Sequence, residues 1–314
     1  MKIVYMGTPD FAVLPLRAMK EAGYEVAAVV TQPDKPKGRG KTMMPTPVKE
    51  EAVALGIPVY QPAKVREPEF QEKLKEIAPD LIVVAAFGQI IPNSILTLPR
   101  FGCINIHASL LPKYRGAAPI QQAVIDGEKE SGVTIQKMGE GLDTGDMISK
   151  AVVVLSPEET GGSLFDKLSA AGADLLVKTL PSIFAGTAVY EKQPEESPTP
   201  YASMITKQMG LLDFTKSAEV LERLVRGLNP WPSAYTFLNG KTLKVWKSRV
   251  GEEKGSALPG TVVKTDKNGI HVACCDKTLI LEEIQLEGKK RMDADAFLRG
   301  YPVETGTKFS DKKE

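Results

Sequence analysis

The 314 residues and the 42% hydrophobic content of this chain exceed what one ordinary core needs, so we expect a globular protein of two domains. The longest apolar runs, such as the one that begins at Leu81, are shorter than the roughly 20 residues of a membrane span. The first five residues already have the pattern of a strand, so we expect no signal peptide. Three cysteines form neither a disulfide framework nor a metal-ligand spacing, so we expect a protein of the reducing cytoplasm.

The net charge of +1 hides a difference between the two halves of the chain. From Lys207 onward there are 19 Lys and Arg against 15 Asp and Glu, so the second half is positive and the first is negative. A small positive excess is compatible with a polyanionic partner, and equally with a solvated lysine-rich surface.

Apolar bursts alternate with amphipathic stretches along the first half of the chain. The order of strand, helix and strand indicates a mostly parallel sheet covered on both faces, that is, a Rossmann-like, doubly wound α/β fold. The first turn, from Gly7 to Asp10, lacks the glycine pattern of a dinucleotide site. We expect strands at 2–7, 24–30, 57–60, 81–87 and 102–108, and helices at 10–22, 48–55, 69–77 and 117–126.

Two alternating runs follow, at 132–138 and 145–155, and their pattern predicts a hairpin whose loop carries Asp143. A helix is expected at 160–184. Prolines and glutamates then dominate with little apolar content, which is typical of a linker. We therefore expect a first domain at 1–189 and a linker at 190–206.

The second domain, 207–314, is expected to begin with a helix at 217–228 and continue with short strands. Glycine and charged turns separate these strands, which favours a small antiparallel barrel of the OB type. Trp231 and Trp246 are expected to pack in a core or between the domains, with base stacking as the alternative. The strands are expected at 233–240, 241–248, 260–266, 269–275 and 278–286.

Asn105 and His107 are the first candidates for chemistry. Only two histidines occur in the chain, and His107 directly precedes the proline-stopped run Ala108–Pro112. Successive side chains of a strand point to opposite faces, so Asn105 and His107 share a face. Their strand would end at the carboxyl edge of a parallel sheet, where ligands bind. The alternative is a structural histidine with satisfied hydrogen bonds.

Four segments together carry a family resemblance: residues 105–120, the run GLDTGDM at 141–147, the basic loop 31–41 and the NPWP turn at 229–232. In these segments the chain resembles the formyltetrahydrofolate-dependent formyltransferases, and among them the bacterial enzymes that act on methionine-charged initiator tRNA. The resemblance covers both domains in order. It implies transfer of the formyl group of 10-formyltetrahydrofolate to the α-amino group of methionine on initiator tRNA, with a catalytic first domain and a tRNA-binding second domain.

The chemistry itself suggests roles for three residues. Attack of an amine on a formyl carbon creates a negative oxygen, while the attacking nitrogen must lose a proton. The amide of Asn105 offers two donors for that oxygen. His107 can donate to the oxygen or carry a proton. Asp143 accepts the amine proton through water or orients His107; without the resemblance it would be assigned to a turn.

Two loops are predicted to bind the folate. By resemblance, Ser109 takes part in folate binding, and Leu110, Leu111 and Pro112 line the same folate pocket. Pro112 makes this loop stiff. The second candidate is the end of another strand, up to Ile91, with Ile90 and Ile91 as core residues in the alternative interpretation. Its residues are Phe87, Gly88 and Ile90.

The basic loop is the predicted contact with tRNA. Flexible glycines and several cations suit a loop that orders on a phosphate backbone. By resemblance it would enter the acceptor stem; the alternative is a solvated loop. Its cations are Lys35, Lys37, Arg39 and Lys41.

No metal is expected, since neither histidine has carboxylate or thiolate neighbours at ligand spacing. We expect a monomer without a membrane partner. Three other functions compete with transfer to initiator tRNA: formyl transfer to a small acceptor, hydrolysis of the folate donor to formate, and RNA binding without catalysis.

Overall fold

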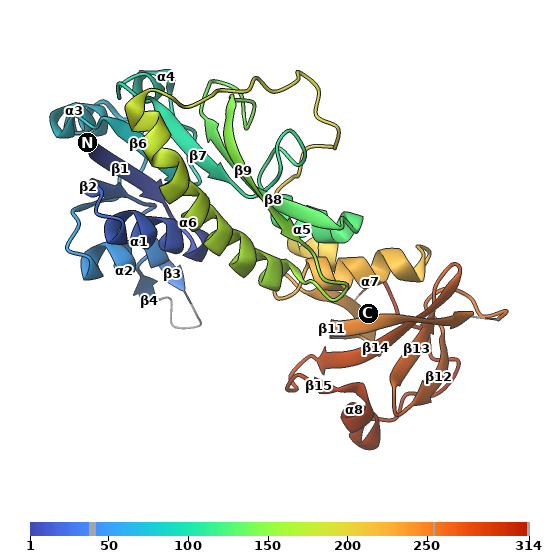
Figure 1. The fold of residues 1–314 in the computed structure, drawn as a ribbon. Coiled ribbons are helices and arrows are strands. Elements are labelled where there is room, and N and C mark those ends of the chain that lie inside the picture. Colours follow the sequence, from blue (N-terminus) through green and yellow to red (C-terminus); the bar gives the residue numbers. More distant parts are fainter. Residues whose placement is uncertain (38–41, 254, 313–314) are drawn as a thin grey trace. The chain divides into compact units, whose positions relative to one another are not determined.

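A computed structural model describes residues 1–37, 42–253 and 255–312. They pack as two compact units (Figure 1). The first unit comprises Met1–Pro119, Glu130–Val154 and Phe165–Ala202. The second comprises Ile120–Lys129, Leu155–Leu164 and Ser203–Glu314.

The first unit is built on a seven-stranded sheet in the order β5-β2-β1-β6-β7-β8-β9 (Figure 1). The strands from β5 to β7 in this order run parallel, and β8 and β9 are antiparallel to their neighbours. This confirms the predicted parallel-dominated sheet and the predicted hairpin. The strands are β1 (Lys2–Gly7), β2 (Glu25–Val30), β5 (Val59–Tyr60), β6 (Leu81–Ala85), β7 (Cys103–His107), β8 (Glu130–Lys137) and β9 (Met147–Val154).

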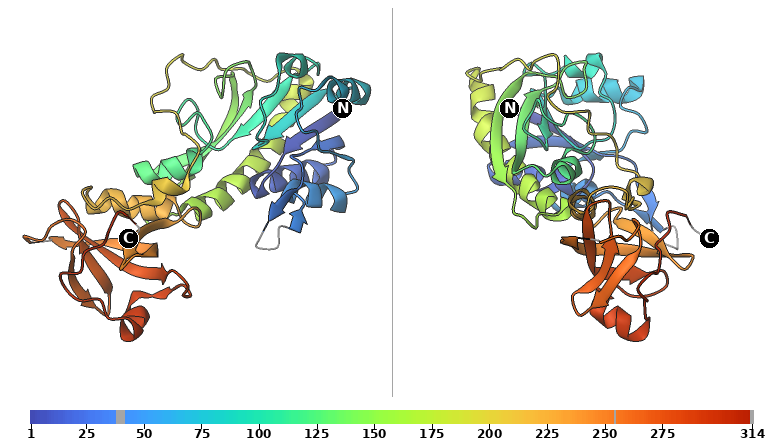
Figure 2. Two further views of the ribbon diagram at one scale, coloured as in Figure 1. Left: turned by 180° about the vertical axis from the view of Figure 1, so that it is seen from behind. Right: turned by 90° about the vertical axis from the view of Figure 1, so that its right-hand side faces the viewer.

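Helices cover both faces of this sheet (Figures 1 and 2). In β1 the buried side chains alternate: Val4 and Met6 join the core beneath α3 and α4, while the Tyr5 hydroxyl donates to the carbonyl oxygen of Ala12 at the start of α1. Gly172 of α6 approaches Ile106 on the same face as α1. The covering helices are α1 (Val13–Glu21), α2 (Pro47–Ala54), α3 (Pro68–Ile77), α4 (Asn93–Leu96) and α6 (Gly161–Ala185), the last of which belongs to this unit from Phe165 onward. Helix α5 (Pro119–Asp126) belongs to the second unit from Ile120 onward.

The chain reverses its direction across the sheet between β1 and β6. From β1 it proceeds to β2 and β5 on one side, and from β6 it proceeds to β7 on the other. In open α/β sheets such a switch point leaves a crevice outside the carboxyl ends of the strands, which is where ligands bind.

Among the described residues, α6 is long and apolar enough to cross a membrane by length and composition. This differs from the expectation from the sequence, in which the longest apolar runs are strand-sized. Half of the most apolar window of α6 is buried inside the protein, and a core helix passes the same test. The contact of Gly172 with Ile106 places the helix against the sheet.

The second unit has a mainly antiparallel sheet in the order β10-β11-β14-β13-β12, with β15 beside β14. Helix α7 supplies Leu221 and Val225 to its core. Trp231 is 54% exposed in the turn after α7, so it does not lie in a core. The elements are α7 (Ala218–Gly227), β10 (Ala234–Leu238), β11 (Lys241–Glu253), β12 (Val262–Asp266), β13 (Gly269–Ala273), β14 (Lys277–Leu286), β15 (Met292–Asp293) and α8 (Ala294–Gly300).

The segment predicted as a linker packs on the first unit. Glu191 forms two backbone hydrogen bonds with Met147 of β9, both 2.8 Å long, and Gln193 is buried. Composition missed these contacts because they are made by main-chain groups and one polar side chain. The domain boundaries 1–189, 190–206 and 207–314 stay a prediction.

Candidate active site

Asn105 and His107 lie on the face of β7 that continues the core beneath α3 and α4, since Cys103, two residues earlier, belongs to that core. Across the antiparallel pair, Asn105 faces Gln136 and His107 faces Thr134. Directly opposed residues project from the same face of a sheet, so these four polar side chains lie together.

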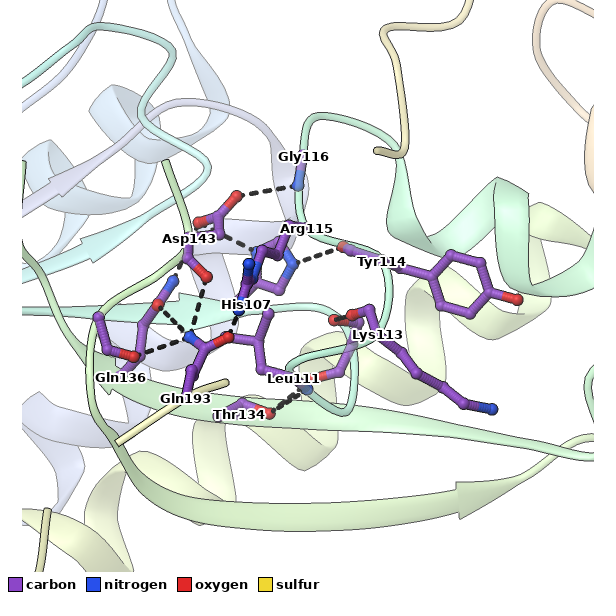
Figure 3. A network of polar contacts seen from close by, with 12 residues as sticks. His107, Leu111, Lys113, Tyr114, Arg115, Gly116, Thr134, Gln136, Asp143 and Gln193 are labelled. Carbon is purple, nitrogen blue, oxygen red and sulfur yellow. Dashed lines mark hydrogen bonds and ion pairs between the residues drawn. The ribbon is translucent and has the colours of Figure 1, made fainter. Parts of the chain in front are cut away.

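His107 is held at both ring nitrogens (Figure 3). It is 6% exposed, and its Nε2 atom lies 2.9 Å from the main-chain oxygen of Tyr114. A carbonyl oxygen only accepts, so Nε2 carries a hydrogen. The Nδ1 atom lies 3.5 Å from Oδ1 of Asp143. The ring therefore stands between two acceptors, and the doubly protonated form donates toward both.

Asp143 is fixed by a donor at each carboxylate oxygen (Figure 3). Gln136 Nε2 donates to Oδ1 over 2.9 Å, and the backbone N–H of Gly116 donates to Oδ2 over 3.0 Å. The backbone of Asp143 is left-handed, with φ of 53°, a conformation that Asp tolerates better than most residues. The structure thus brings this predicted residue to His107, 36 positions away in the chain.

Asn105 differs from its neighbours because its side chain makes no hydrogen bond to any residue that the structure describes. Asn105 is partly exposed, whereas Gln136 opposite it is buried. Both amide hydrogens are therefore available to a bound molecule.

Gln193 is a site residue that the sequence analysis missed. Its Nε2 atom donates to the carbonyl oxygens of Asp143, over 2.9 Å, and Gly145, over 2.7 Å. Its Oε1 atom accepts from Arg115 Nε over 3.1 Å. A Cβ atom on Gly145 would lie 1.8 Å from the oxygen of Lys137, so only glycine permits this path of the loop.

Arg115 is 8% exposed and also binds the segment that contains Gln193. Its terminal nitrogens donate to the carbonyl oxygens of Glu195, over 3.0 Å, and Pro194, over 2.7 Å. Gln136 could have been found by pairing it with Asn105 across the neighbouring strands β7 and β8. Gln193 carried no such signal, because its partners are main-chain oxygens 48 and 50 positions away.

The loop predicted to bind folate is held in shape by hydroxyl groups. Ser109 is wholly enclosed, and its Oγ donates to the oxygen of Lys113 over 2.6 Å. Thr134 Oγ1 donates to the oxygen of Ser109 over 2.7 Å and accepts from the N–H of Leu111 over 3.0 Å. Ser109 thus shapes the loop from within, and its hydroxyl is already in use.

Leu110, Leu111 and Pro112 line a cavity of about 400 Å³ that reaches Val152 of β9 and Pro198. A volume of this size lies within the range of small-molecule sites. Its walls are mainly apolar, with Lys150 among the lining residues.

The second predicted folate segment follows β6. Phe87 is buried, and its carbonyl oxygen accepts from Thr8 Oγ1 over 2.8 Å. Gly88 is exposed with φ of 83°. Ile90 is 81% exposed, so the alternative that it is a core residue is wrong, whereas Ile91 is buried in the core.

The predicted tRNA loop contains a short hairpin of β3 (Lys35–Lys37) and β4 (Thr42–Met44). Lys35 is exposed on β3; Arg39 and Lys41 lie outside the described residues. Asp34, at the base of the hairpin, accepts from Lys49 over 2.7 Å and from Gln61 over 2.6 Å. These two donors lower the pKa of the Asp34 carboxyl, with the hydrogen bond from Gln61 as the largest cause.

Within residues 1–37, 42–253 and 255–312 there is no group of three His, Cys, Asp or Glu side chains arranged to hold a metal ion. The carboxylate at His107 is already held by an amide and a backbone N–H. Asn105, His107 and Asp143 together supply hydrogen-bond donors and a proton carrier.

Two family models match the chain. The model described as "Formyl transferase" matches residues 1–180, and "Formyl transferase, C-terminal domain" matches residues 204–302. By fold and by these matches, the chain belongs to the formyl transferase family.

Relatives that align with nearly the whole chain show to which formyl transferases it is similar. The chain is 58% identical over 310 residues to the methionyl-tRNA formyltransferase of Agathobacter rectalis, covering 99% of this chain and 100% of the relative. It is 54% identical over 306 residues to the methionyl-tRNA formyltransferase of Bacillus subtilis, covering 97% and 96%. The chain is therefore a member of the methionyl-tRNA formyltransferase family.

Solved structures share the fold at lower identity. The N-formyltransferase of Helicobacter canadensis, solved with folinic acid and dTDP-3-aminofucose, is 20% identical with a TM-score of 0.66, covering 90% of this chain and 98% of that one. The HypX protein of Aquifex aeolicus, solved with tetrahydrofolic acid, is 16% identical with a TM-score of 0.60, covering 99% and 50%.

Proposed function

We propose that this chain transfers the formyl group of 10-formyltetrahydrofolate to the α-amino group of methionine on initiator tRNA. The observation that carries the proposal is the placement of His107 between the oxygen of Tyr114 and Asp143, beside the unused amide of Asn105. The proposal is also supported by the relatives of the chain, since methionyl-tRNA formyltransferases match it over nearly its full length.

Asn105 stabilises the oxygen that becomes negative when the amine attacks the formyl carbon. Its amide hydrogens are free of protein partners among the described residues, so no hydrogen bond has to break. Its backbone is fixed in β7 between β6 and β8, which orients the side chain in advance. Removing one such donor typically lowers the rate by about 100- to 1000-fold.

His107 and Asp143 manage the proton. The attacking amine loses one proton, and the folate nitrogen that releases the formyl group gains one, so the transfer needs a carrier but no net acid. Nε2 of His107 is committed to the oxygen of Tyr114, which leaves Nδ1 as the exchanging position. Asp143 orients the ring and balances its charge, because both carboxylate oxygens are already held by donors.

The substrates are assigned to the surrounding loops. The folate lies against Leu110–Pro112 and the exposed Gly88 and Ile90, with Ser109 and Phe87 fixing the two loops from inside. The acceptor stem meets the basic loop, through Lys35, Lys37, Arg39 and Lys41.

The second domain completes the tRNA site as an OB-type barrel. Ser310 pairs with Phe237 of β10, and Lys308 pairs with Thr261 beside β12, so the C-terminal segment joins the two outer strands of that sheet. Closure of this kind supports the barrel. We further propose that the protein acts as a monomer in the cytoplasm, with the folate donor and tRNA as its partners.

One assay tests the proposal against its alternatives. The protein is mixed with 10-formyltetrahydrofolate labelled in the formyl group and with methionine-charged initiator tRNA. We expect the label in acid-precipitable aminoacyl-tRNA. Label in free formate indicates a hydrolase, label in an added small amine only indicates a different acceptor, and label that remains in the folate indicates a protein that binds RNA without catalysis.

A further inference from the structure

A second cavity lies at the switch point of the sheet, apart from the cavity beside Leu110. It has a volume of about 180 Å³, and it is lined by Thr8, which follows β1, and by Gln32, which follows β2. The hairpin of β3 and β4 contributes Lys35, Pro36 and Met44 to the lining. The cavity therefore occupies the place where an open α/β sheet binds its ligand.

The walls of this cavity suit a planar, weakly polar group. Pro33, Pro36 and Pro45 line it with apolar rings, and Met44 lines it with a polarizable thioether side chain, which makes favourable contacts with aromatic rings. Gln32 adds one polar position: its Nε2 donates to the oxygen of Phe87 over 3.3 Å, and its Oε1 has no donor in the part of the chain that the structure describes.

Hydrogen bonds hold the segments that form the cavity wall in place. Thr31 and Thr46 share a buried hydrogen bond of 2.7 Å. Thr46 also caps α2 by accepting from the N–H of Lys49 over 3.1 Å. Thr8 and Gln32 both donate to Phe87, so the cavity is tied to the loop that we assign to folate. A wall with this support is formed before a ligand arrives.

Size and distance identify the occupant. Sites for drug-sized molecules begin at about 300 Å³, so this cavity holds one ring system and not a folate. Strands β1 and β2 lie two and three positions from β7, which at the usual strand spacing is roughly 10–14 Å. The methionine side chain is attached next to the reacting amine and therefore lies too close to it to reach the cavity. The terminal base of the tRNA is separated from the amine by the ribose as well, so the base fits the distance between the cavity and β7.

The rim of the cavity carries a cation. Lys35 lines it, is exposed, and forms no ion pair with any residue described. A phosphate next to the base would meet this ammonium group. The cavity is also continuous with the basic loop through Lys35 and Pro36 of β3.

We propose that this cavity binds the 3′-terminal adenine of the aminoacyl-tRNA, between the rings of Pro33, Pro36 and Pro45 and the thioether of Met44, with Lys35 facing the adjoining phosphate. The inference rests on the proposed function, since it assumes a tRNA acceptor. It gives the 3′ end a binding position from which the methionyl amine reaches Asn105 and His107.

The first test uses trinucleotides and the full chain, without catalysis. Affinities of the RNA trinucleotides CCA and CCC are compared by NMR titration, with Met44→Ala as the variant and Met43→Ala as its matched control. Met43 is also an exposed methionine of β4, but it points to the opposite face and does not line the cavity. We expect CCA to bind more tightly than CCC, and Met44→Ala alone to weaken CCA by about three- to tenfold.

The second test separates this inference from the proposed function. If the wild-type protein formylates methionyl-tRNA, Met44→Ala is expected to raise KM for that tRNA by a similar factor, with little change in kcat. Equal binding of CCA and CCC, or equal effects of Met43→Ala and Met44→Ala, would overturn the inference while leaving the proposed function intact. So would a Met44→Ala variant that binds CCA normally but no longer distinguishes methionine from alanine on the same tRNA, because the cavity would then hold the amino-acid side chain. A wild-type protein that does not formylate methionyl-tRNA refutes the proposed function instead.

Discussion

Oδ1 of Asp143 lies 3.5 Å from Nδ1 of His107, and Gln136 Nε2 donates to the same oxygen over 2.9 Å. The carboxylate is thus directed at the ring by a neighbour on β8. Its second oxygen accepts from Gly116, which belongs to the same loop as the Tyr114 carbonyl that holds Nε2 of the ring. Both contacts of His107 therefore depend on the path of one short loop.

Asp143→Asn is expected to lower kcat by about 100- to 10,000-fold. An asparagine has one acceptor where Asp143 uses two, so it must leave either Gln136 or Gly116 facing an NH2 group. The ring then loses its charge partner and its fixed orientation. Steady-state kinetics with methionyl-tRNA measure the effect. Glu140→Gln, an exposed carboxylate change in the same loop, serves as the control and should leave kcat unchanged. An Asp143→Asn variant as active as this control would show that Asp143 does not act on His107.

Gln193→Ala is expected to affect catalysis more than folding. We expect a clear fall in kcat and a smaller effect on the temperature of thermal unfolding. The substitution removes the donors to the oxygens of Asp143 and Gly145, which hold the catalytic loop. It also leaves the buried Arg115 without one of its acceptors. Lys192→Ala, at the exposed neighbouring position, is the control. The variants are compared by kinetics and by thermal unfolding. Equal kcat values for the two would mean that the segment only covers the site.

The sequence predicted the parallel strands of the first unit because they are continuous apolar runs, and β8 and β9 because they alternate. The short helix α4 and the hairpin of β3 and β4 were not predicted. The face shared by Asn105 and His107 followed from strand alternation alone. The contacts of Gln193 could not be predicted, because main-chain oxygens carry no residue identity in a sequence. The exposure of Ile90 was equally hidden, since an apolar residue beside a strand reads as core whether or not a helix covers it.

The affinity for tRNA is expected to fall with rising salt, with a slope that depends on the basic loop. Neutralising its four cations should flatten the log-log slope by roughly 0.7–0.9 for each phosphate contact that is lost. Filter binding between low and moderate salt measures this. Lys73→Gln together with Lys75→Gln on α3 is the control, because both lysines already pair with glutamates of the same helix. An unchanged slope in the loop variant would remove the loop from the interface.

One of the three thiols is expected to react in the native protein. Burial raises the pKa of both the Cys103 and the Cys274 thiols to about 12, so neither forms a thiolate near neutral pH, whereas Cys275 is exposed. A disulfide exchange reagent should titrate one thiol in the native state and three in denaturant. In the Cys275→Ser control the native count should fall to zero. Rapid reaction of a second native thiol would indicate that one of the two cores opens readily.

The stability that Asp34 contributes at the base of the basic hairpin is expected to decrease as the pH falls. Hydrogen bonds from Gln61 and Lys49 lower the folded-state pKa of Asp34 below its unfolded value. A depressed carboxyl pKa contributes stability above the unfolded pKa and loses it as the pH falls through the lower folded value. Asp34→Asn should therefore lower Tm at neutral pH, and its difference from wild type should shrink in acid. Asp174→Asn, at an exposed position on α6, is the control and should show a smaller difference from wild type at neutral pH. A difference between wild type and Asp34→Asn that grows in acid would contradict the proposed ion pair.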